Sequence, residues 1–146
     1  MNVFVSGIPL GQPRPRAYAM KMGGRYTARM YDAGTTDAWK KAIVVTTKMV
    51  ASAPLNLSEA HVTLDFTMPR PKHHFRTGIH HHQLKTNAPR SHVGRPDLDN
   101  LCKAVLDALT DSGVCWNDDG CISSLVLTKN YGPDPGVLIT INAPQR

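Results

Sequence analysis

The clearest pattern in the chain is the alternation of apolar and polar residues between His61 and Met68. Val62, Leu64, Phe66 and Met68 occupy every second position, and polar residues stand between them. A period of two puts the apolar side chains on one face of a strand. The segment is therefore predicted to be a β-strand with one buried face.

Three further runs also predict strands. The first of them in the chain is β-branched and aromatic and is ended by Pro9 and Gly11. These runs are Val3–Ile8, Cys121–Lys129 and Val137–Ile141. The last two are joined by residues 132–136, whose glycines, prolines and aspartate predict a turn.

Two segments instead show helical spacing. The first starts at Thr36, which can cap a helix, and must end before Pro54. The second runs over Leu98–Leu109 and is ended by Gly113. The apolar positions of the two stripes are Trp39, Ala42, Ile43, Thr46 and Val50, then Leu98, Leu101, Cys102, Val105, Ala108 and Leu109.

The order β-α-β-α-β-β predicts a single α+β domain over residues 1–146, with two helices on one face of a mixed sheet. Residues 9–31 and 69–96 are expected to be long basic loops. No apolar run approaches the roughly 20 residues of a membrane span, and no signal peptide is recognised, so a cytoplasmic protein is expected. The three cysteines show no paired spacing and are expected to be free thiols.

Charge is unevenly distributed along the chain. The net charge is +6 and the pI about 9.5, which suits a polyanionic partner. Both expected loops are rich in lysine and arginine, and residues 69–96 contain no acid. Their basic side chains are candidates for contacts to DNA phosphates, or alternatively ordinary solvated charge. The candidates are Arg14, Arg16, Lys21, Arg25, Arg70, Lys72, Arg76 and Arg95.

Histidines gather in the second loop, at positions 73, 74 and 80–82. A zinc site there is disfavoured, because no cysteine or acid accompanies them and their spacing fits no standard zinc motif. A flexible loop that faces DNA and gains charge below about pH 6.5 is the better interpretation. His61 is expected to face solvent.

Negative charge, in contrast, is concentrated between Asp97 and Asp119. Six of the eleven carboxylates lie there, with Lys103 as the only basic residue. A simple structural interpretation exists: one aspartate caps the helix, and Asp99, Lys103 and Asp107 form a surface charge ladder worth about 0.3–0.5 kcal/mol per pair. Whether the Asp118–Asp119 turn reaches the helix start depends on the fold.

A metal ion offers a functional interpretation of this cluster. Carboxylates brought together in a cationic chain raise one another's pKa unless a cation compensates them. Mg²⁺ prefers such hard oxygen ligands together with substrate phosphate, and it can activate water for phosphodiester hydrolysis. Lys103, one turn after Asp99, could contact the scissile phosphate.

The run RPDLDNLCKAVLDAL, followed by Gly113, Trp116 and the NDD of residues 117–119, resembles the signature of the RusA family of Holliday-junction resolvases. The N-terminal strand, the Pro-Arg-Pro-Arg stretch at 13–16 and the Tyr131–Gly132 pair resemble the same family. By motif position, Asp97, Asp99 and Asp119 match its essential aspartates and Lys103 its essential lysine, with Asp118 as the alternative third carboxylate.

This resemblance implies a homodimer that binds four-way DNA junctions and makes paired nicks in opposing strands with Mg²⁺ or Mn²⁺. Asp97, Asp99 and Asp119, with Asp118 as the alternative third carboxylate, would hold the metal. Two alternatives stay open: a nuclease acting on branched or flap DNA more broadly, and a noncatalytic module that only binds junctions.

Overall fold

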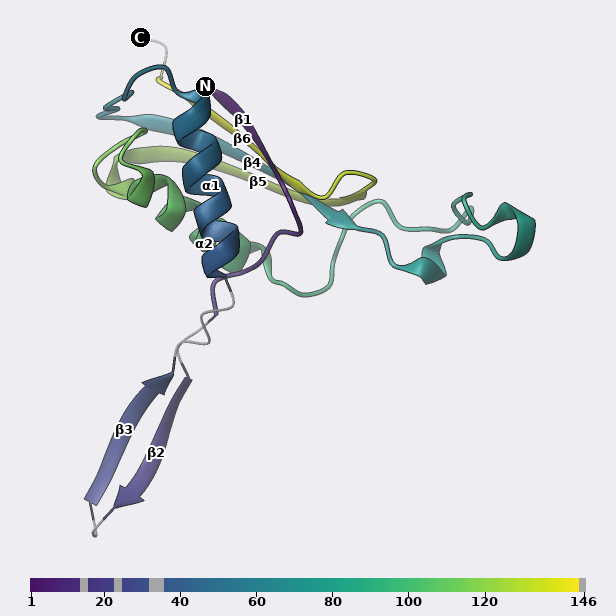
Figure 1. Ribbon diagram of the computed structural model, residues 1–146, viewed down its shortest axis with the longest axis horizontal. Helices are drawn as coiled ribbons and strands as arrows, with labels where there is room; N and C mark the ends of the chain where they lie inside the picture. Colours follow the sequence, from purple (N-terminus) through teal and green to yellow (C-terminus); the bar gives the residue numbers. More distant parts are fainter. Residues whose placement is uncertain (14–15, 23–24, 32–35, 145–146) are drawn as a thin grey trace.

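The computed structural model describes residues 1–13, 16–22, 25–31 and 36–144; for the segments 16–22 and 25–31 the backbone pairing alone is described. A four-stranded sheet has the order β1-β6-β4-β5 (Figure 1). Its strands are β1 (Asn2–Ser6), β4 (Ala60–Pro69), β5 (Ile122–Gly132) and β6 (Gly136–Asn142). β4 pairs parallel with β5, whereas its pairing with β6 and that of β1 with β6 are antiparallel. The predicted mixed sheet is therefore confirmed.

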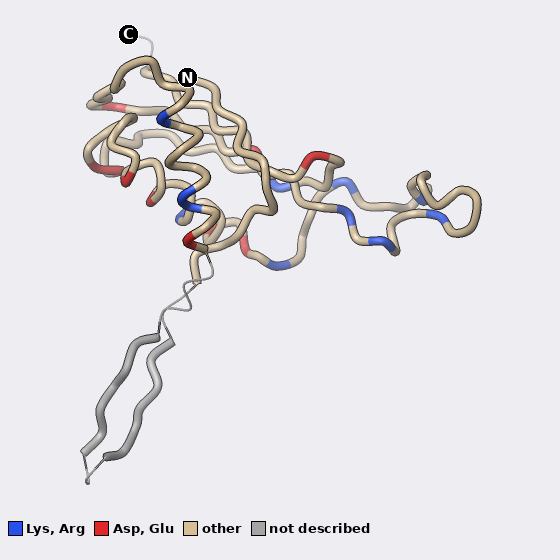
Figure 2. Tube along the Cα trace, viewed as in Figure 1, with Lys and Arg blue, Asp and Glu red and all other residues tan. Residues whose placement is uncertain are grey.

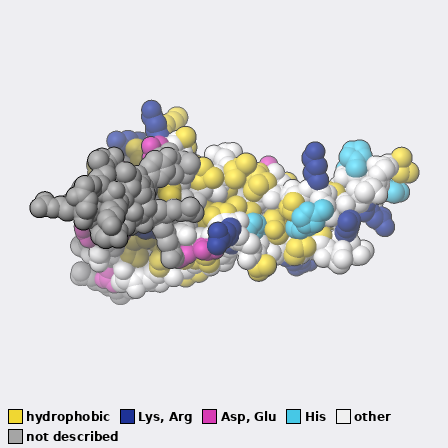
Figure 3. Space-filling model, turned by 90° about the horizontal axis from the view of Figure 1, so that it is seen from below, with side chains coloured by type: hydrophobic (Ala, Val, Ile, Leu, Met, Phe, Trp, Pro, Cys, Tyr) yellow, Lys and Arg dark blue, Asp and Glu magenta, His cyan; other side chains and the backbone are white. Residues whose placement is uncertain are grey.

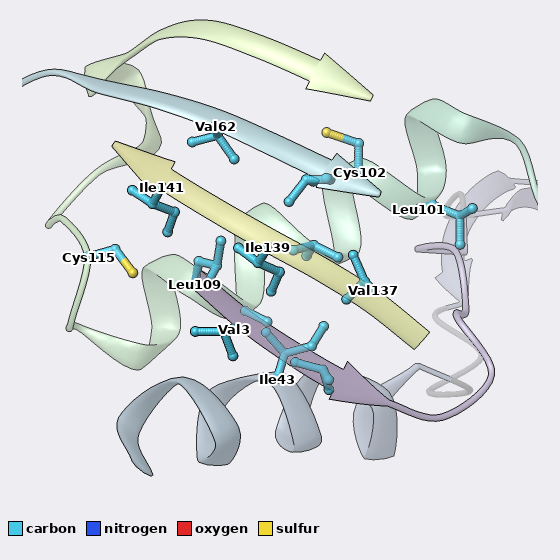
Figure 4. Packing of buried hydrophobic residues seen from close by; sticks show 14 of the residues in the cluster. Val3, Ile43, Val62, Leu101, Cys102, Leu109, Cys115, Val137, Ile139 and Ile141 are labelled. Atoms are coloured by element: carbon cyan, nitrogen blue, oxygen red, sulfur yellow. The ribbon is translucent and has the colours of Figure 1, made fainter. Parts of the chain in front are cut away.

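Two helices, α1 (Asp37–Val50) and α2 (Leu98–Ser112), cover one face of this sheet and pack against each other. Val62, Leu64, Phe66 and Met68 all point into the core, as their alternation predicts. Figure 4 shows how side chains from β1, β4 and β6 meet those of both helices. The fold class expected from the sequence, a small α+β domain, is confirmed.

The helix boundaries follow the local sequence. Gly113 ends α2 in the left-handed region, with φ +64°, which glycine adopts without steric cost. Thr36 is the N-cap residue of α1, but its side chain makes no capping hydrogen bond. The buried face of α1 is formed by Trp39, Ile43 and Thr47. Thr47 thus takes the place that the helical pattern gave to Thr46.

The expected basic loop at 9–31 is a wrong prediction. Two strands, β2 (Arg16–Met22) and β3 (Arg25–Tyr31), pair antiparallel from Arg16 opposite Tyr31 to Met22 opposite Arg25. Between them the sequence carries Gly23-Gly24, a two-residue signal for a tight hairpin. Tyrosine, threonine and methionine suit strands, but the interspersed basic residues hide the alternation.

The second basic segment is a long connection with its own structure. We call residues 70–96 the arm, which extends away from the sheet and helices (Figure 1). It contains two short 3-10 turns, η1 (Lys72–His74) and η2 (Gly78–His80), and an isolated β-bridge between Phe75 and Leu84. The arm is therefore more regular than the expected loop.

Among the described parts of the chain, no helix has both the length and the apolar composition needed to cross a bilayer. All three cysteines are free thiols, and Cys102 and Cys115 are buried. Burial raises the pKa of the Cys115 thiol to about 11. His61 is exposed on β4, as expected.

Candidate active site

Asp97 and Asp99 lie at the beginning of α2, both exposed to solvent. Asp97 is the N-cap residue, and its carbonyl accepts the first helical hydrogen bond from Leu101 N at 3.1 Å. Its side chain makes no capping hydrogen bond. The capping role that would explain this carboxylate without any ligand is therefore not fulfilled in the structure.

Two contacts fix the segment that leads into α2. Lys129 Nζ, on β5, donates hydrogen bonds to the carbonyls of Gly94 and Pro96, each at 2.7 Å. From the other side, Gln12 N donates to Asn100 O at 2.9 Å. The backbone just before Asp97 and the first turn after it are thus both held in place.

The N-terminal segment passes very close to this turn. A Cβ on Gly11 would lie only 3.1 Å from the Asn100 Cβ and 3.3 Å from the Pro96 Cβ. Next to it, Gln12 Oε1 is buried and lacks a hydrogen-bond partner among the described residues. A buried amide oxygen without a partner is costly unless a cation or water satisfies it. Carboxylate and amide oxygens, which Asp97, Asp99 and Gln12 carry, are hard ligands of the kind that Mg²⁺ prefers.

Lys103 lies one turn further along α2 and is 65% exposed. Its ammonium is 3.5 Å from Asp107 Oδ1, and Lys40 on α1 lies 3.4 Å from Asp107 Oδ2. Asp107 therefore joins α2 to α1 through Lys40, and its contact with Lys103 lies within α2. Exposed pairs of this kind contribute little stability, about 0–1 kcal/mol, so Lys103 can leave its partner for a phosphate at small cost.

Asp118 and Asp119 lie beyond the other end of α2. Asp119 begins the 3-10 turn η3 (Asp119–Cys121), and Asp118 Oδ1 accepts a hydrogen bond from Gly120 N at 2.7 Å. Both carboxylates are exposed. A helix of 15 residues is about 22 Å long, and this length separates the two aspartate pairs. Figure 2 shows acidic residues toward both ends of α2.

Across the described residues, no three histidine, cysteine or acidic side chains lie close enough together to hold a metal ion. One copy of the chain brings Asp97 and Asp99 to the same helix start, but it does not bring Asp118 or Asp119 to them. An ion shared by all three predicted ligands remains a prediction, and within this geometry it needs carboxylates from more than one copy.

The comparison with protein families gives one result that covers residues 7–142, nearly the whole chain, and its description is Endodeoxyribonuclease RusA. This chain belongs to the RusA endodeoxyribonuclease family. None of the curated proteins matches it. Membership indicates a hydrolase that cuts DNA internally, and the resemblance inferred from residues 95–119 is confirmed.

In this RusA chain, the arm carries all four of the basic candidates for DNA contacts whose side chains are described. Lys72, Arg76 and Arg95 are exposed. Arg70 is half-buried at the base of the arm and donates to Pro89 O at 2.8 Å. Figure 3 shows Lys, Arg and His side chains gathered along the arm. The other candidates, Arg14, Arg16, Lys21 and Arg25, lie outside the residues whose side chains are described.

A ring cluster at the base of the arm was not anticipated from the sequence. The Tyr131 ring on β5 contacts His74 edge-on, with centroids 4.9 Å apart, and also His92 at 4.8 Å. The Arg70 guanidinium lies over the same ring at 5.4 Å. Burial, followed by neighbouring positive charge, lowers the pKa of His74 and that of His92. With both histidines neutral, the cluster packs the base of the arm against β5.

Lys129 and Gln12 were also missed. Neither stands in a motif, and both act through tertiary contacts with the backbone around Asp97. One usable signal existed for Lys129: it is a charged residue on the strand face that otherwise points toward the helices.

Proposed function

We propose that this protein resolves four-way DNA junctions as a homodimer, by Mg²⁺-dependent paired nicks in opposing strands, with Mn²⁺ as a possible substitute. Its place of action would be the cytoplasm. The observation that carries the proposal is the pair of exposed carboxylates at the start of α2 in a strongly basic chain, where the Asp97 side chain makes no capping hydrogen bond and the Gln12 backbone is bonded to the same helical turn.

The proposed roles follow from position. Asp97 and Asp99 hold the metal, with Asp119, or Asp118 in its place, as the third carboxylate. When bound, the ion lowers the pKa of a water and neutralises charge that develops on the phosphate. Lys103, exposed one turn after Asp99, contacts a non-bridging oxygen of the scissile phosphate.

A second copy of the chain can bring the separated carboxylates together. β5 pairs only with β4 within the described sheet, so the edge of residues 122–128 is open. Leu125 and Val126 on it are 41% and 52% exposed. Antiparallel pairing of two such edges about a two-fold axis sets the beginning of one β5 beside the end of the other. Asp119 of one copy then approaches the Lys129 end of its partner, which is held to the backbone before Asp97.

Subunit mixing tests this arrangement. Asp97→Asn and Asp119→Asn are each expected to abolish nicking of a synthetic four-way junction in Mg²⁺. A mixture of the two variants, refolded or exchanged together, regains nicking, because half of the dimers carry one intact site built from the remaining Asp97 and Asp119. These dimers have a single working site, so they nick one strand and do not cut in pairs.

The controls separate the possible failures. Asp111→Asn, which removes an exposed carboxylate near the end of α2 outside the proposed site, is expected to nick normally. Activity in either single variant would remove that residue from the site. An inactive mixture of variants that still form mixed dimers would mean that the site does not combine residues of two copies.

Matched junction, flap and linear duplex substrates decide between the proposed resolvase and a broader branched-DNA nuclease. Preferential cutting of the four-way junction supports the proposal. Binding without cutting, in any divalent metal, would identify a noncatalytic module.

A further inference from the structure

A hollow of about 490 Å³ lies between the base of the arm and the turn that joins β5 to β6. Its size falls within the roughly 300–1,000 Å³ of ordinary small-molecule sites. Most of its lining is apolar. The lining residues are Pro69, Arg70, Phe75, His82, Leu84, Gly132, Pro133 and Pro135.

Its walls are built before any ligand arrives. Phe75 and Leu84 face each other across the β-bridge of the arm, which backbone hydrogen bonds reinforce on both sides. The opposite wall is formed by the turn at 132–135, where prolines restrict the backbone. Arg70 is fixed by its hydrogen bond to Pro89 O and its position over the Tyr131 ring. A ligand would therefore enter with little ordering cost.

The chemistry of the lining favours a flat, uncharged ring over a phosphate. Phenylalanine, proline and leucine offer apolar surfaces, whereas among the described lining residues only Arg70 and His82 can carry positive charge. Asp134 lies between two lining prolines, and a carboxylate there repels an anion. The exposed cations outside the hollow, Lys72 and Arg76 on the arm, suit the phosphates that flank such a ring.

The hollow also lies near the end of β5 that contacts the backbone before Asp97. Tyr131 and Gly132 follow Lys129 on β5 by two and three residues, or about 7–10 Å of strand. Lys129 donates to Pro96 O, immediately before Asp97. A strand of DNA whose phosphate is at Asp97 therefore has a neighbouring nucleotide within reach of this hollow.

We propose that the hollow binds a single nucleobase that has left the base stack at the branch point of the DNA. The inference rests on the proposed branched-DNA substrate and adds a site to it. Extruding a base costs less where its pairing or stacking is already weakened, and the exchange of strands at a branch point removes the continuous stack on one side of a base. Packing of the base on Phe75, beside the Arg70 guanidinium, then makes the protein sensitive to branched structure without reading a long sequence.

The test is a double-mutant cycle between Phe75 and the DNA, measured as binding in EDTA so that no cutting occurs. Junctions are made with an abasic residue at each nucleotide next to the branch point in turn. Stacking of one base on an aromatic side chain contributes about 1–3 kcal/mol, so Phe75→Ala is expected to weaken binding of the intact junction by about 5- to 150-fold. The same substitution should have little effect on the junction that lacks the bound base.

Ile79→Ala is the matched control, because Ile79 lies on the arm, is 82% exposed and does not line the hollow. It should bind every substrate normally, and linear duplex should bind equally to all variants. Since Phe75→Ala could disturb the arm itself, Pro133→Ala probes the opposite wall and should show the same dependence on the abasic position in weaker form.

Additive effects of Phe75→Ala and every abasic position would overturn the proposal, as would unaltered junction affinity in both variants. If Phe75→Ala instead reduced the salt dependence of junction binding and showed no dependence on the abasic position, the hollow would contact a phosphate. That result would also refute the proposal. Because these measurements need no metal, a protein that fails to cut but passes them would count against the proposed nuclease chemistry alone.

Discussion

Lys129 offers the sharpest test of how the site is positioned. Its ammonium bonds the carbonyls of Gly94 and Pro96, directly before Asp97. Lys129→Met keeps most of the aliphatic chain and removes both bonds. A hydrogen bond to a charged group contributes about 1.5–3 kcal/mol when shielded and less when exposed; the Pro96 bond is partly buried and the Gly94 bond exposed. We therefore assign about 2 kcal/mol of stabilisation to the two Lys129 hydrogen bonds together.

If this energy holds Asp97 in the geometry that binds metal, its loss weakens Mg²⁺ affinity by about 30-fold, since each 1.4 kcal/mol is a factor of ten. The assay is the initial rate of junction nicking as a function of Mg²⁺ concentration. The midpoint should rise by about 10- to 30-fold, and the plateau rate should return at high Mg²⁺, because no ligand or phosphate contact has been removed.

Lys85→Met is the control: it removes the same charge from an exposed position on the arm. It should leave the midpoint where it is in the unaltered protein, apart from a small general effect on DNA binding. Equal midpoints for the two variants would refute the positioning role. A lower plateau that added Mg²⁺ cannot restore would place Lys129 in the chemistry itself.

Three further results are expected. Phe66→Ala, in the centre of the core, should lower the free energy of unfolding in urea by about 3–5 kcal/mol, whereas Met49→Ala, 81% exposed, should leave it nearly unchanged. Because the pKa of the buried Cys115 thiol is raised to about 11, iodoacetamide at pH 8.5 should modify the more accessible Cys121 and spare Cys115 in the folded protein, as mass spectrometry can check. For the same reason the free energy of unfolding should fall as pH rises from 9 toward 11, which pH-dependent melting can check. The lowered pKa of His74 means that the neutral ring is favoured in the fold, so its stabilising effect is present above pH 6.5 and is lost as pH falls below it. The hydrogen-exchange protection factors of residues 89–92, corrected for the slower intrinsic exchange at low pH, should therefore fall between pH 7 and 5. Unchanged protection factors would show that this histidine does not hold the arm.

The sequence predicted those parts of the fold in which local pattern and tertiary burial agree. The alternation in β4 and the helical stripe of α2 both point to the core, and Gly113 marks the end of α2 by backbone conformation alone. The β2–β3 hairpin was missed because basic residues interrupt its alternation. Its Gly23-Gly24 pair was the signal that could have revealed it.

The candidate site could be identified residue by residue but could not be assembled. The motif located Asp97, Asp99 and Lys103 within the first two turns of one helix, since that depends only on spacing. The position of Asp119 depends on the direction in which the chain returns after α2, and the return leads away from the helix start. Contacts made by Lys129 and Tyr131 join segments more than thirty residues apart, which no local pattern encodes.

The separation of the aspartate pairs along α2 has a consequence for how the cutting activity of such an enzyme would depend on its concentration in the cell. If each cutting centre is completed only by a second copy, a newly made chain is harmless while it is scarce. Cutting would then rise steeply with abundance, roughly as its square when pairs are few. Dosage alone would set a threshold below which chromosomes are spared, with no inhibitor required.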